Sequence, residues 1–269
     1  MKLSIITINY NNKAGLQKTI DSVICQTWKD YEWIIIDGGS TDGSKELIEK
    51  YQEYFAYWCS EPDKGIYNAL NKGILHCNGD YISCMNSGDT FFEKKTLYKV
   101  FSTIRTEDIL YGDWIQLHNE CQYKIHFPYP VDLYNIVYSH ICHQAMFVKS
   151  TLLKENGFDE SYCIAADYCN WIKFVYNGAS FGFINTTICQ YDMKGVSSTL
   201  IELRDKEFKR AINENIPETI RLSLFRLHKI EKEYINDLLI KYYVKPIEKK
   251  GGIADYVMTL LLKVIKKIL

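Results

Sequence analysis

The 269-residue chain lacks an excess of charge of either sign, because 32 Lys and Arg residues stand against 33 Asp and Glu residues. Its first 200 residues carry no stripe of Lys and Arg of the kind that follows a nucleic-acid backbone. The composition therefore gives no reason to expect nucleic acid as a partner. With 47% hydrophobic residues, the chain is long enough for one large α/β domain or two small ones.

Long apolar runs and paired cysteines are also missing. No apolar run reaches the length of a membrane span, and the start MKLSIITINYNN has neither the apolar core nor the cleavage site of an export signal. The nine cysteines form no C-x-x-C pair, so we expect reduced core thiols in a cytoplasmic protein. His140 and His143 are three residues apart, but no third ligand stands near them, which argues against a zinc site.

The common phosphate-binding fingerprints are absent as well. The segment IIIDGGSTDGS contains neither G-x-G-x-x-G nor the G-x-x-x-x-G-K-[ST] loop. Asp42 is explained as the cap of the following helix. Asp37, at the end of a strand, is instead predicted to accept a hydrogen bond from the base or ribose of a ligand. The 21 Tyr and 12 Phe residues suit stacking on a base or sugar, but large amphipathic core and surface residues are the simpler interpretation.

The first hundred residues alternate between strand and helix patterns. Apolar runs at 3–8, 33–37, 56–60 and 81–85 are separated by helical spacing, which predicts an α/β fold with a doubly wound, mostly parallel sheet. Ligands of such sheets bind beyond the carboxyl ends of the strands. The polar residues that follow the four strands are Asn9, Asp37, SEPDKG and NSGD, and we expect them to converge on one nucleotide site.

The pattern changes after about residue 105. We expect longer strands at 108–118, 143–150 and 180–191, and a helix over 166–178 with Gly178 as its C-cap. From residue 199 onward the chain is richer in charge and in helix formers.

Four segments carry a resemblance: SIITINYNN, IIIDGGSTDGS, SEPDKGIYNALNKGI and GDYISCMNSGDT. In this order and spacing they resemble the nucleotide-sugar half of a family 2 glycosyltransferase with the GT-A fold. The closest likeness is to bacterial enzymes that build capsular, exopolysaccharide and lipopolysaccharide units. The resemblance implies a catalytic domain over 1–200, divided into a nucleotide-sugar half (1–105) and an acceptor half (106–200). A helical extension would follow over 201–269.

The resemblance also implies a set of donor contacts. Thr7 and Asn9 would lie near the base and ribose, Asp37 would hydrogen-bond the nucleobase, and Asp63 with Lys64 would line the nucleoside pocket. Asn68 stands where many relatives carry an aspartate, and a donor role and a plain polar helix position both stay open for it. Asn71 and Gly73 match the family and are expected to let their helix pack closely on the sheet.

The segment NSGD occupies the place of the Asp-x-Asp motif of GT-A enzymes, which holds a divalent cation against the donor diphosphate. Ser87 takes the first acidic position, so the resemblance implies Asp89 as the one direct protein ligand of Mn²⁺ or Mg²⁺, with Ser87 assisting and Asn86 and Gly88 beside the donor. A hard cation needs few protein ligands when phosphate oxygens and water supply the rest. The alternative is that Asp89 only shapes the turn.

The segment IAADYCNWIKF resembles the one whose aspartate is the catalytic base of an inverting transfer, which points to Asp167. Ala166 replaces the acid that often precedes this base. A carboxylate at this place would also be stabilised by the start of the helix, and the two roles are compatible. Asp113 is the reserve candidate for acceptor binding or base. His143 matches the acceptor side of the family pattern, although a purely structural histidine explains it equally well.

Two segments complete the predictions. YDMKGVSS (191–198) resembles a loop over the donor, in which Lys194, Gly195, Ser197 and Ser198 would contact the diphosphate; ordinary loop chemistry is the alternative. The tail 251–269 combines an apolar helix with lysines. It would lie on the inner face of the cytoplasmic membrane, near a lipid-linked acceptor, or would pack on the catalytic domain or another subunit of a homo-oligomer.

The predicted activity is an inverting, metal-dependent transfer of a sugar from a nucleoside-diphosphate donor, UDP by family habit, to a growing glycan. A nucleotidyltransferase is the main rival, but TINYNNKAG lacks the Gly-rich loop with Lys or Arg that grips a triphosphate. A non-catalytic nucleotide-sugar-binding scaffold is the other rival. The joint presence of Asp37, Asp89 and Asp167 argues against it.

Overall fold

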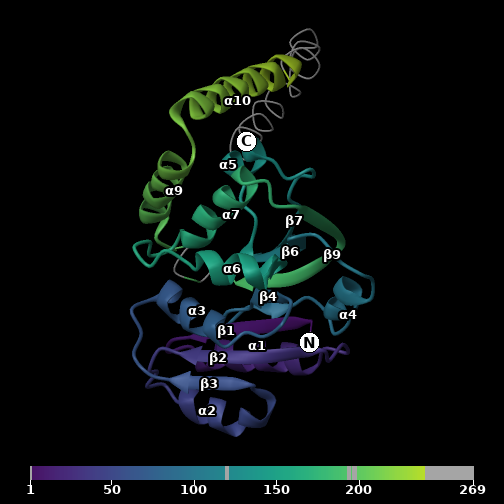
Figure 1. Cartoon of the computed structure of the whole chain (residues 1–269), viewed down its shortest axis with the longest axis vertical. Coiled ribbons are helices and arrows are strands. Elements are labelled where there is room, and N and C mark those ends of the chain that lie inside the picture. Colours follow the sequence, from purple (N-terminus) through teal and green to yellow (C-terminus); the bar gives the residue numbers. More distant parts are fainter. Residues whose placement is uncertain (1, 119–120, 193–194, 196–198, 240–269) are drawn as a thin grey trace, which may run out of the picture. The chain divides into compact units, whose positions relative to one another are not determined.

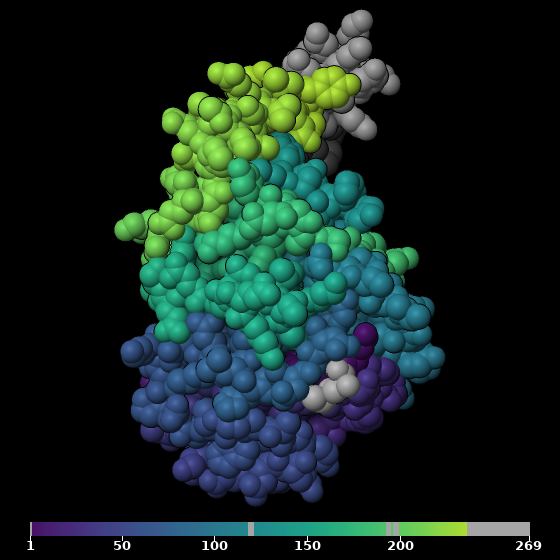
Figure 2. All heavy atoms as spheres, in the orientation of Figure 1, coloured from purple at the N-terminus to yellow at the C-terminus, as the bar shows by residue number. Residues whose placement is uncertain are grey.

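The computed structural model describes residues 2–118, 121–192, 195 and 199–239 (Figure 1). The chain divides into two compact units, Met1–Ile216 and Pro217–Leu269. In the space-filling view, atoms from the early part of the first unit (purple and blue) adjoin those from its later part (teal and green) without a break (Figure 2).

The N-terminal part of the first unit is the predicted alternation of strands and helices. In chain order these elements are β1 (Leu3–Asn9), α1 (Lys13–Ile24), β2 (Tyr31–Asp37), α2 (Ser44–Lys50), β3 (Tyr57–Ser60), α3 (Ile66–Leu75) and β4 (Tyr81–Cys84). The four strands are parallel and lie in the order β3-β2-β1-β4. The prediction of an α/β sheet with a parallel N-terminal half is confirmed.

The later elements extend this sheet with mixed strand directions. They are β5 (Thr90–Phe91), α4 (Thr96–Phe101), β6 (Ile109–His118), β7 (Cys121–Ile125), α5 (Leu133–Tyr138), β8 (Met146–Lys149), α6 (Ser150–Asn156), α7 (Ala166–Tyr176), β9 (Phe181–Asp192) and α9 (Ile201–Asn215). The described strands form one nine-stranded sheet, β3-β2-β1-β4-β8-β6-β9-β5, with β7 paired to β6. Strand β8 joins β4 and β6 antiparallel, whereas β6 and β9 are parallel.

One predicted strand is shorter than expected. The segment 143–150 begins as a 3₁₀ turn over His143–Ala145, and only Met146–Lys149 forms β8. The turn frees two polar side chains, His143 and Gln144, to reach across to other elements. The C-terminal end of α7 is as predicted, because Gly178 follows it with a positive φ of 79°.

The apolar runs of the sequence become strands that are buried on both faces. Consecutive residues of a strand point to opposite faces, yet Ile5, Ile6, Ile34 and Ile35 are all fully buried. Helix α3 packs on β1 and β2, so one face is covered by the segment that follows β3 in the chain. Such burial explains why these strands read as continuous rather than alternating apolar runs.

The chain order around β1 creates the place for a ligand. From β1 the chain moves outward to β2 and β3, and then returns to place β4 on the other side of β1. The connections on the two sides of this reversal leave a crevice at the carboxyl ends of β1 and β4. Beyond β4 the chain stays against β1, because Met85 N–H donates to the carbonyl of Ile6 and Ser87 N–H donates to that of Ile8.

The boundary of the catalytic domain at residue 200 stays a prediction. Helix α9 belongs to the first compact unit and packs on α7, with the rings of Phe208 and Tyr168 4.3 Å apart. The second unit contains α10 (Glu218–Leu239), and the tail 251–269 lies outside the described residues. Among the helices that the structure describes, none combines the length and the apolar character of a bilayer-crossing segment.

Gly73 provides a test of the close packing of α3 on the sheet. A Cβ atom at this position would lie 2.7 Å from Cγ2 of the buried Ile6. Alanine favours a helix over glycine by about 1 kcal/mol, but overpacking a core costs about 1–3 kcal/mol. We expect Gly73→Ala to lower the free energy of unfolding, measured by urea denaturation.

The matched control is Gly73→Ala in an Ile6→Ala background. There the clash is absent, so the gain in helix propensity should reappear and the substitution should stabilise that variant. A stabilising effect of Gly73→Ala in the wild-type background would contradict the packing argument.

Candidate active site

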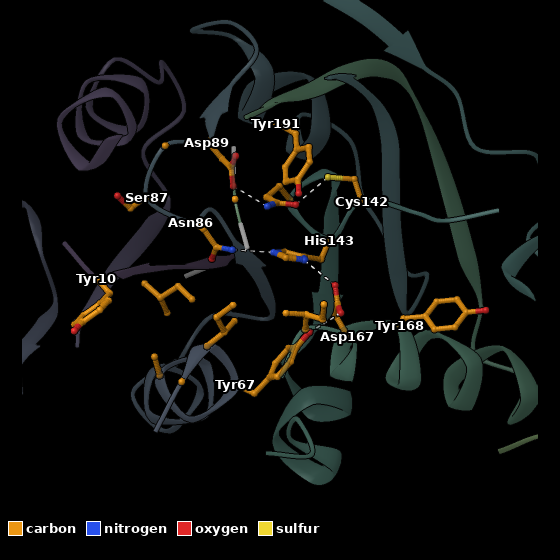
Figure 3. A pocket seen from close by; sticks show the side chains of 18 of the residues that line it. Tyr10, Tyr67, Asn86, Ser87, Asp89, Cys142, His143, Asp167, Tyr168 and Tyr191 are labelled. Carbon is orange, nitrogen blue, oxygen red and sulfur yellow. Dashed lines mark hydrogen bonds and ion pairs between the residues drawn. The ribbon is translucent and has the colours of Figure 1, made fainter. Parts of the chain in front are cut away.

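A cavity of about 1030 Å³ lies at the carboxyl edge of β1 and β4 (Figure 3). Its lining comes from both halves of the first unit and includes most of the predicted site residues that the structure describes: Asn9, Asp63, Asn86, Ser87, Gly88, Asp89, His143, Asp167 and Gly195. Thr7, Asp37, Lys64 and Asp113 are not among the lining residues. Lys194, Ser197 and Ser198 lie outside the described residues.

Asp37 is fully buried behind the cavity and its carboxylate is occupied by neighbours. Oδ1 accepts from Asn9 Nδ2 at 2.7 Å and from the Ser40 hydroxyl at 2.6 Å. Oδ2 accepts from the Ser60 hydroxyl at 2.6 Å and from Ser40 N–H at 2.9 Å. Burial raises the pKa of Asp37, but the hydrogen bonds from Ser40, Ser60 and Asn9 outweigh it, so the pKa lies below its ordinary value.

These bonds make Asp37 a brace between the ends of β1, β2 and β3. Its contact with a nucleobase stays a prediction. Thr7 has a similar bracing place, since its hydroxyl donates to the carbonyl of Met85 at 2.8 Å and accepts from Trp33 Nε1 at 3.0 Å. Thr7 is fully buried, so its predicted place near the base and ribose also stays a prediction.

The loop after β3 carries Asp63 to the cavity. Its Oδ1 accepts from Gly65 N–H at 2.8 Å, and Gly65 has the positive φ of 113° that favours glycine. Asn68 joins this loop to the loop before α7, because its amide accepts from Lys64 N–H and donates to Glu160. Asn68 therefore has the contacts of a structural residue.

The turn Asn86–Asp89 is hydrogen-bonded through its backbone to Thr19 of α1. The Thr19 hydroxyl donates to the carbonyl of Asp89 at 2.8 Å and accepts from Gly88 N–H at 3.0 Å. Gly88 has a φ of 105°, a conformation that residues with a side chain rarely adopt. The bonds to Thr19 thus fix the turn, and the Asp89 carboxylate lines the cavity.

Asp89 is 5% exposed and is oriented by a residue that the sequence did not single out. Gln144 Nε2 donates to Asp89 Oδ2 at 2.7 Å, and the thiol of Cys142 donates to Gln144 Oε1 (Figure 3). In the part of the chain that the structure describes, no three His, Cys, Asp or Glu side chains gather into a metal site. The donor set at this turn fits a hard cation that takes one carboxylate from the protein and its other oxygens from a substrate.

Asp167 lies at the start of α7 in a chain of hydrogen bonds that crosses the cavity (Figure 3). Its Oδ2 pairs with His143 Nδ1 at 2.8 Å, and its Oδ1 accepts from the Tyr67 hydroxyl at 2.8 Å. Nε2 of His143 in turn faces the amide nitrogen of Asn86 at 3.1 Å. Tyr67, on α3, is a second site residue that sequence reasoning missed.

These hydrogen bonds shift the pKa of Asp167 and the pKa of His143 in the directions that stabilise an ion pair between them. Burial raises the pKa of Asp167, but hydrogen bonding and charge from His143, together with the Tyr67 hydroxyl, hold it below its ordinary value. Burial lowers the pKa of His143, but the hydrogen bond and charge of Asp167 raise it above its ordinary value. Burial and the neighbouring carboxylate raise the pKa of Tyr67, which therefore stays a hydrogen-bond donor.

Asp113 is not part of the hydrogen-bonded row around Asp167; it lies on β6, where the pairing with β9 is irregular. Its carboxylate is 2.7 Å from Lys124 Nζ and 2.8 Å from His126 Nδ1. Because the acid does not line the cavity and both oxygens are engaged, its use in acceptor binding or as a base stays a prediction.

One wall of the cavity is aromatic. The ring of Phe208 on α9 stacks on His140 at 4.5 Å and lies against Tyr168, and the Arg204 guanidinium is 5.9 Å from the Phe208 ring. Trp114 and Trp171 also line the cavity, and their buried indole N–H groups have no partner among the described residues. Flat aromatic rings are the groups that bind the faces of sugars.

Helix α9 also fixes the loop that leads into α7. The Glu207 carboxylate accepts from the backbone N–H groups of Cys163 and Ile164, at 2.8 and 2.9 Å. Further along α9, Glu214 accepts from the Tyr162 hydroxyl and Arg210 donates to Ser161. The start of α7, which carries Asp167, is therefore held by α9.

The family model and the curated relatives that match this chain all point to one family. A model of glycosyl transferase family 2 matches residues 4–173. An uncharacterized glycosyltransferase of Mycobacterium tuberculosis is 31% identical over 210 residues, which cover 73% of this chain and 77% of the relative. A PGL/p-HBAD biosynthesis glycosyltransferase of Mycobacterium bovis is 28% identical over 231 residues, covering 82% and 86%.

Solved structures of similar fold include Staphylococcus aureus TarS 1–349 in complex with UDP-GlcNAc. It has a TM-score of 0.66 at 19% identity, over 82% of this chain and 69% of that one. The mannosyltransferase PcManGT of Pyrobaculum calidifontis, in complex with GDP-Man and Mn²⁺, has a TM-score of 0.59 at 15% identity, over 80% and 64%. These likenesses confirm the predicted GT-A fold.

The brace at Asp37 yields a pH-dependent prediction. Asp37→Asn replaces one acceptor oxygen by a donor among groups that all donate, so we expect a loss of roughly 2 kcal/mol in the free energy of unfolding at pH 7. The folded-state pKa is depressed, so the stabilisation by the wild-type carboxylate is complete well above 3.8 and is lost as the pH falls toward the lower folded value.

The measurement is urea unfolding of wild type and Asp37→Asn at pH 7 and at pH 3. The difference between the two proteins should shrink at pH 3. An equal difference at both pH values would show that the ionised carboxylate is not the stabilising species.

Proposed function

Because the chain belongs to glycosyl transferase family 2 and is a glycosyltransferase, we propose that it moves a sugar from a nucleoside-diphosphate donor to a hydroxyl of a growing surface glycan, with inversion at C1. The observation that carries this proposal is the joint placement of Asp89 and Asp167 on one cavity, at the carboxyl edge of the sheet (Figure 3). The nucleotidyltransferase and scaffold alternatives are set aside with the family assignment.

The donor is proposed to lie against the β1–β4 edge. Asn9, Asp63 and the turn Asn86–Asp89 line this part of the cavity and offer hydrogen-bonding groups to a nucleoside and a diphosphate. We propose uridine as the base, in line with the UDP-GlcNAc complex of TarS, although the GDP-Man complex of PcManGT makes a guanosine donor the natural second test.

We propose Mn²⁺ or Mg²⁺ as the cofactor, held by Asp89 with the assistance of Ser87. Gln144 orients the Asp89 carboxylate by donating a hydrogen bond from its amide to Oδ2. When bound, the cation would neutralise the negative charge that grows on the departing diphosphate.

Asp167 is proposed as the base. The acceptor hydroxyl attacks C1 from the face opposite the diphosphate, the new C1–O bond forms as the old one breaks, and the hydroxyl proton passes to the carboxylate. The lowered pKa of Asp167 keeps the carboxylate ionised at neutral pH, so it is ready to accept that proton.

The acceptor is proposed to lie along the aromatic wall of His140, Tyr168, Trp171 and Phe208. Trp171 is one helical turn beyond Asp167 on α7, so a sugar ring stacked there would present a hydroxyl to the base. The name of the mycobacterial PGL/p-HBAD relative supports a glycolipid-type acceptor. We propose that such an acceptor is lipid-linked and is met at the cytoplasmic face of the membrane.

Metal removal tests the donor site. Transfer should be assayed on UDP-, GDP- and TDP-sugars with Mn²⁺, Mg²⁺ or EDTA. We expect EDTA to abolish turnover and Asp89→Ala to lower kcat on the order of 10²–10³-fold, the size of effect that loss of one transition-state charge contact produces. Asp80→Asn, at an exposed acid paired with Lys2, is the matched control and should be as active as wild type. Turnover that survives both EDTA and Asp89→Ala would make the turn purely structural.

Replacement of the base tests the acceptor side. Asp167→Asn keeps the shape of the side chain but removes the proton acceptor, so kcat should fall about 10²–10⁴-fold. The dissociation constant for the nucleotide, measured by calorimetry, should stay near that of wild type. Loss of nucleotide binding in Asp167→Asn, or retention of kcat, would contradict the assigned role.

A further inference from the structure

The hydrogen-bonded chain Asn86–His143–Asp167–Tyr67 joins four separate segments across the cavity (Figure 3). Asn86 belongs to the donor-side turn, His143 to the segment before β8, Asp167 to α7 and Tyr67 to α3. The side chains of His143 and Asp167 are each 19% exposed, so the middle of the chain faces the cavity rather than the interior. The link therefore connects the proposed donor site to the proposed base.

Asp167 keeps free acceptor capacity within this chain. A carboxylate offers about four lone-pair positions, and His143 and Tyr67 each use one of them. A substrate hydroxyl can therefore donate to Asp167 while both neighbours stay in place. Their contacts orient the carboxylate instead of blocking it.

Asn86 suits either protonation state of His143. When the ring is neutral with its proton on Nδ1, Nε2 accepts from the Asn86 amide nitrogen. Asn86 Oδ1 is buried and has no partner among the described residues. A half-turn of the amide would bring this oxygen to Nε2, where it would accept from the protonated ring.

We propose that His143 is a positioning residue for the base, and that with Asn86 it ties the orientation of Asp167 to the donor-side turn. The proposal rests on the proposed function and adds to it. In the transfer step the acceptor O–H bond breaks and its proton goes to Asp167, while the C1–O bond to the acceptor forms and the bond to the diphosphate takes its electron pair away. His143 gives no proton to the substrate; it holds the receiving carboxylate in line.

The pH dependence of transfer follows from the groups around Asp167. Asp167 interacts with Tyr67 from α3, Cys84 from β4, and His140 and His143 from the segment before β8, and His143 also interacts with Cys142 and with Asp89 of the turn. Removal of His143 takes away the largest influence that lowers the pKa of Asp167 and leaves burial, which raises it. The acid limb of kcat/KM should then move to higher pH, because the base must be ionised to act.

The test is the pH profile of kcat/KM for wild type, His143→Asn and His143→Phe. Asparagine can place an N–H near the position of Nδ1, so His143→Asn keeps a donor without the charge, whereas His143→Phe removes both. We expect the acid limb to move upward from wild type to His143→Asn to His143→Phe. At pH 6 kcat should fall on the order of 10²-fold in His143→Phe, as for a misplaced catalytic group.

His140→Phe is the matched control. His140 lines the same cavity but stacks on Phe208 instead of bonding to Asp167, and phenylalanine can keep that stacking. Because His140 interacts with Asp167 only through charge and not through a hydrogen bond, its acid limb should move much less than that of either His143 variant. A lower rate with an unmoved acid limb in both His143 variants would overturn the proposal and leave His143 a structural residue.

A second readout does not require turnover. The imidazole resonances of His143 can be titrated by NMR in wild type and in Asp167→Asn. The pKa of His143 should lie above its ordinary value in wild type and drop in the variant, where burial alone acts on it. An unchanged titration would overturn the coupling even in an active enzyme. If no donor in the panel is turned over but the titration moves as expected, the proposed function fails while the coupled pair stands.

Discussion

The pairing of β1 with both β2 and β4 is the constraint on which the site depends. It sets the point where the chain reverses direction across the sheet, and it brings the end of β1 next to the turn Asn86–Asp89. The same strand is buried except at Ile8 and carries Thr7 and Asn9, which tie it to the end of β4 and to β2. The site is therefore built at the end of a strand that is paired on both sides, which favours a fixed geometry for the groups of the cavity.

Four acids of the first unit, Asp37, Asp113, Asp89 and Asp167, illustrate how environment assigns a role to a carboxylate. Burying a charge is unfavourable unless hydrogen bonds or an opposite charge compensate it, and each of these acids has such partners. Asp37 and Asp113 have partners on both oxygens and do not reach the cavity. Asp89 and Asp167 have partners that orient them and still line the cavity. Of the four, Asp89 and Asp167 are the two that line the cavity.

The strand-forming runs, the turn NSGD and the aspartate at the start of α7 could be predicted because each is a local signal. Tyr67 and Gln144 could not, because their importance comes from partners that are 100 and 55 residues away. For the same reason the sequence did not reveal the bonds of Asp37 to Asn9, Ser40 and Ser60. The two-residue β5 is fixed by pairing with β9, and no periodicity can appear in so short a segment.

The contact of Glu207 with the loop before α7 has a consequence for the divergence of such enzymes. The family model matches residues 4–173, so α9 lies beyond the matched segment. Yet one carboxylate of this helix holds the loop that leads to the proposed base. A lineage that adopts a new acceptor by changing its C-terminal helices must keep the hydrogen bonds of Glu207 to this loop or replace them with others. Chimeras that join the sheet of one enzyme to the tail of another would inherit specificity and catalytic alignment as a single trait.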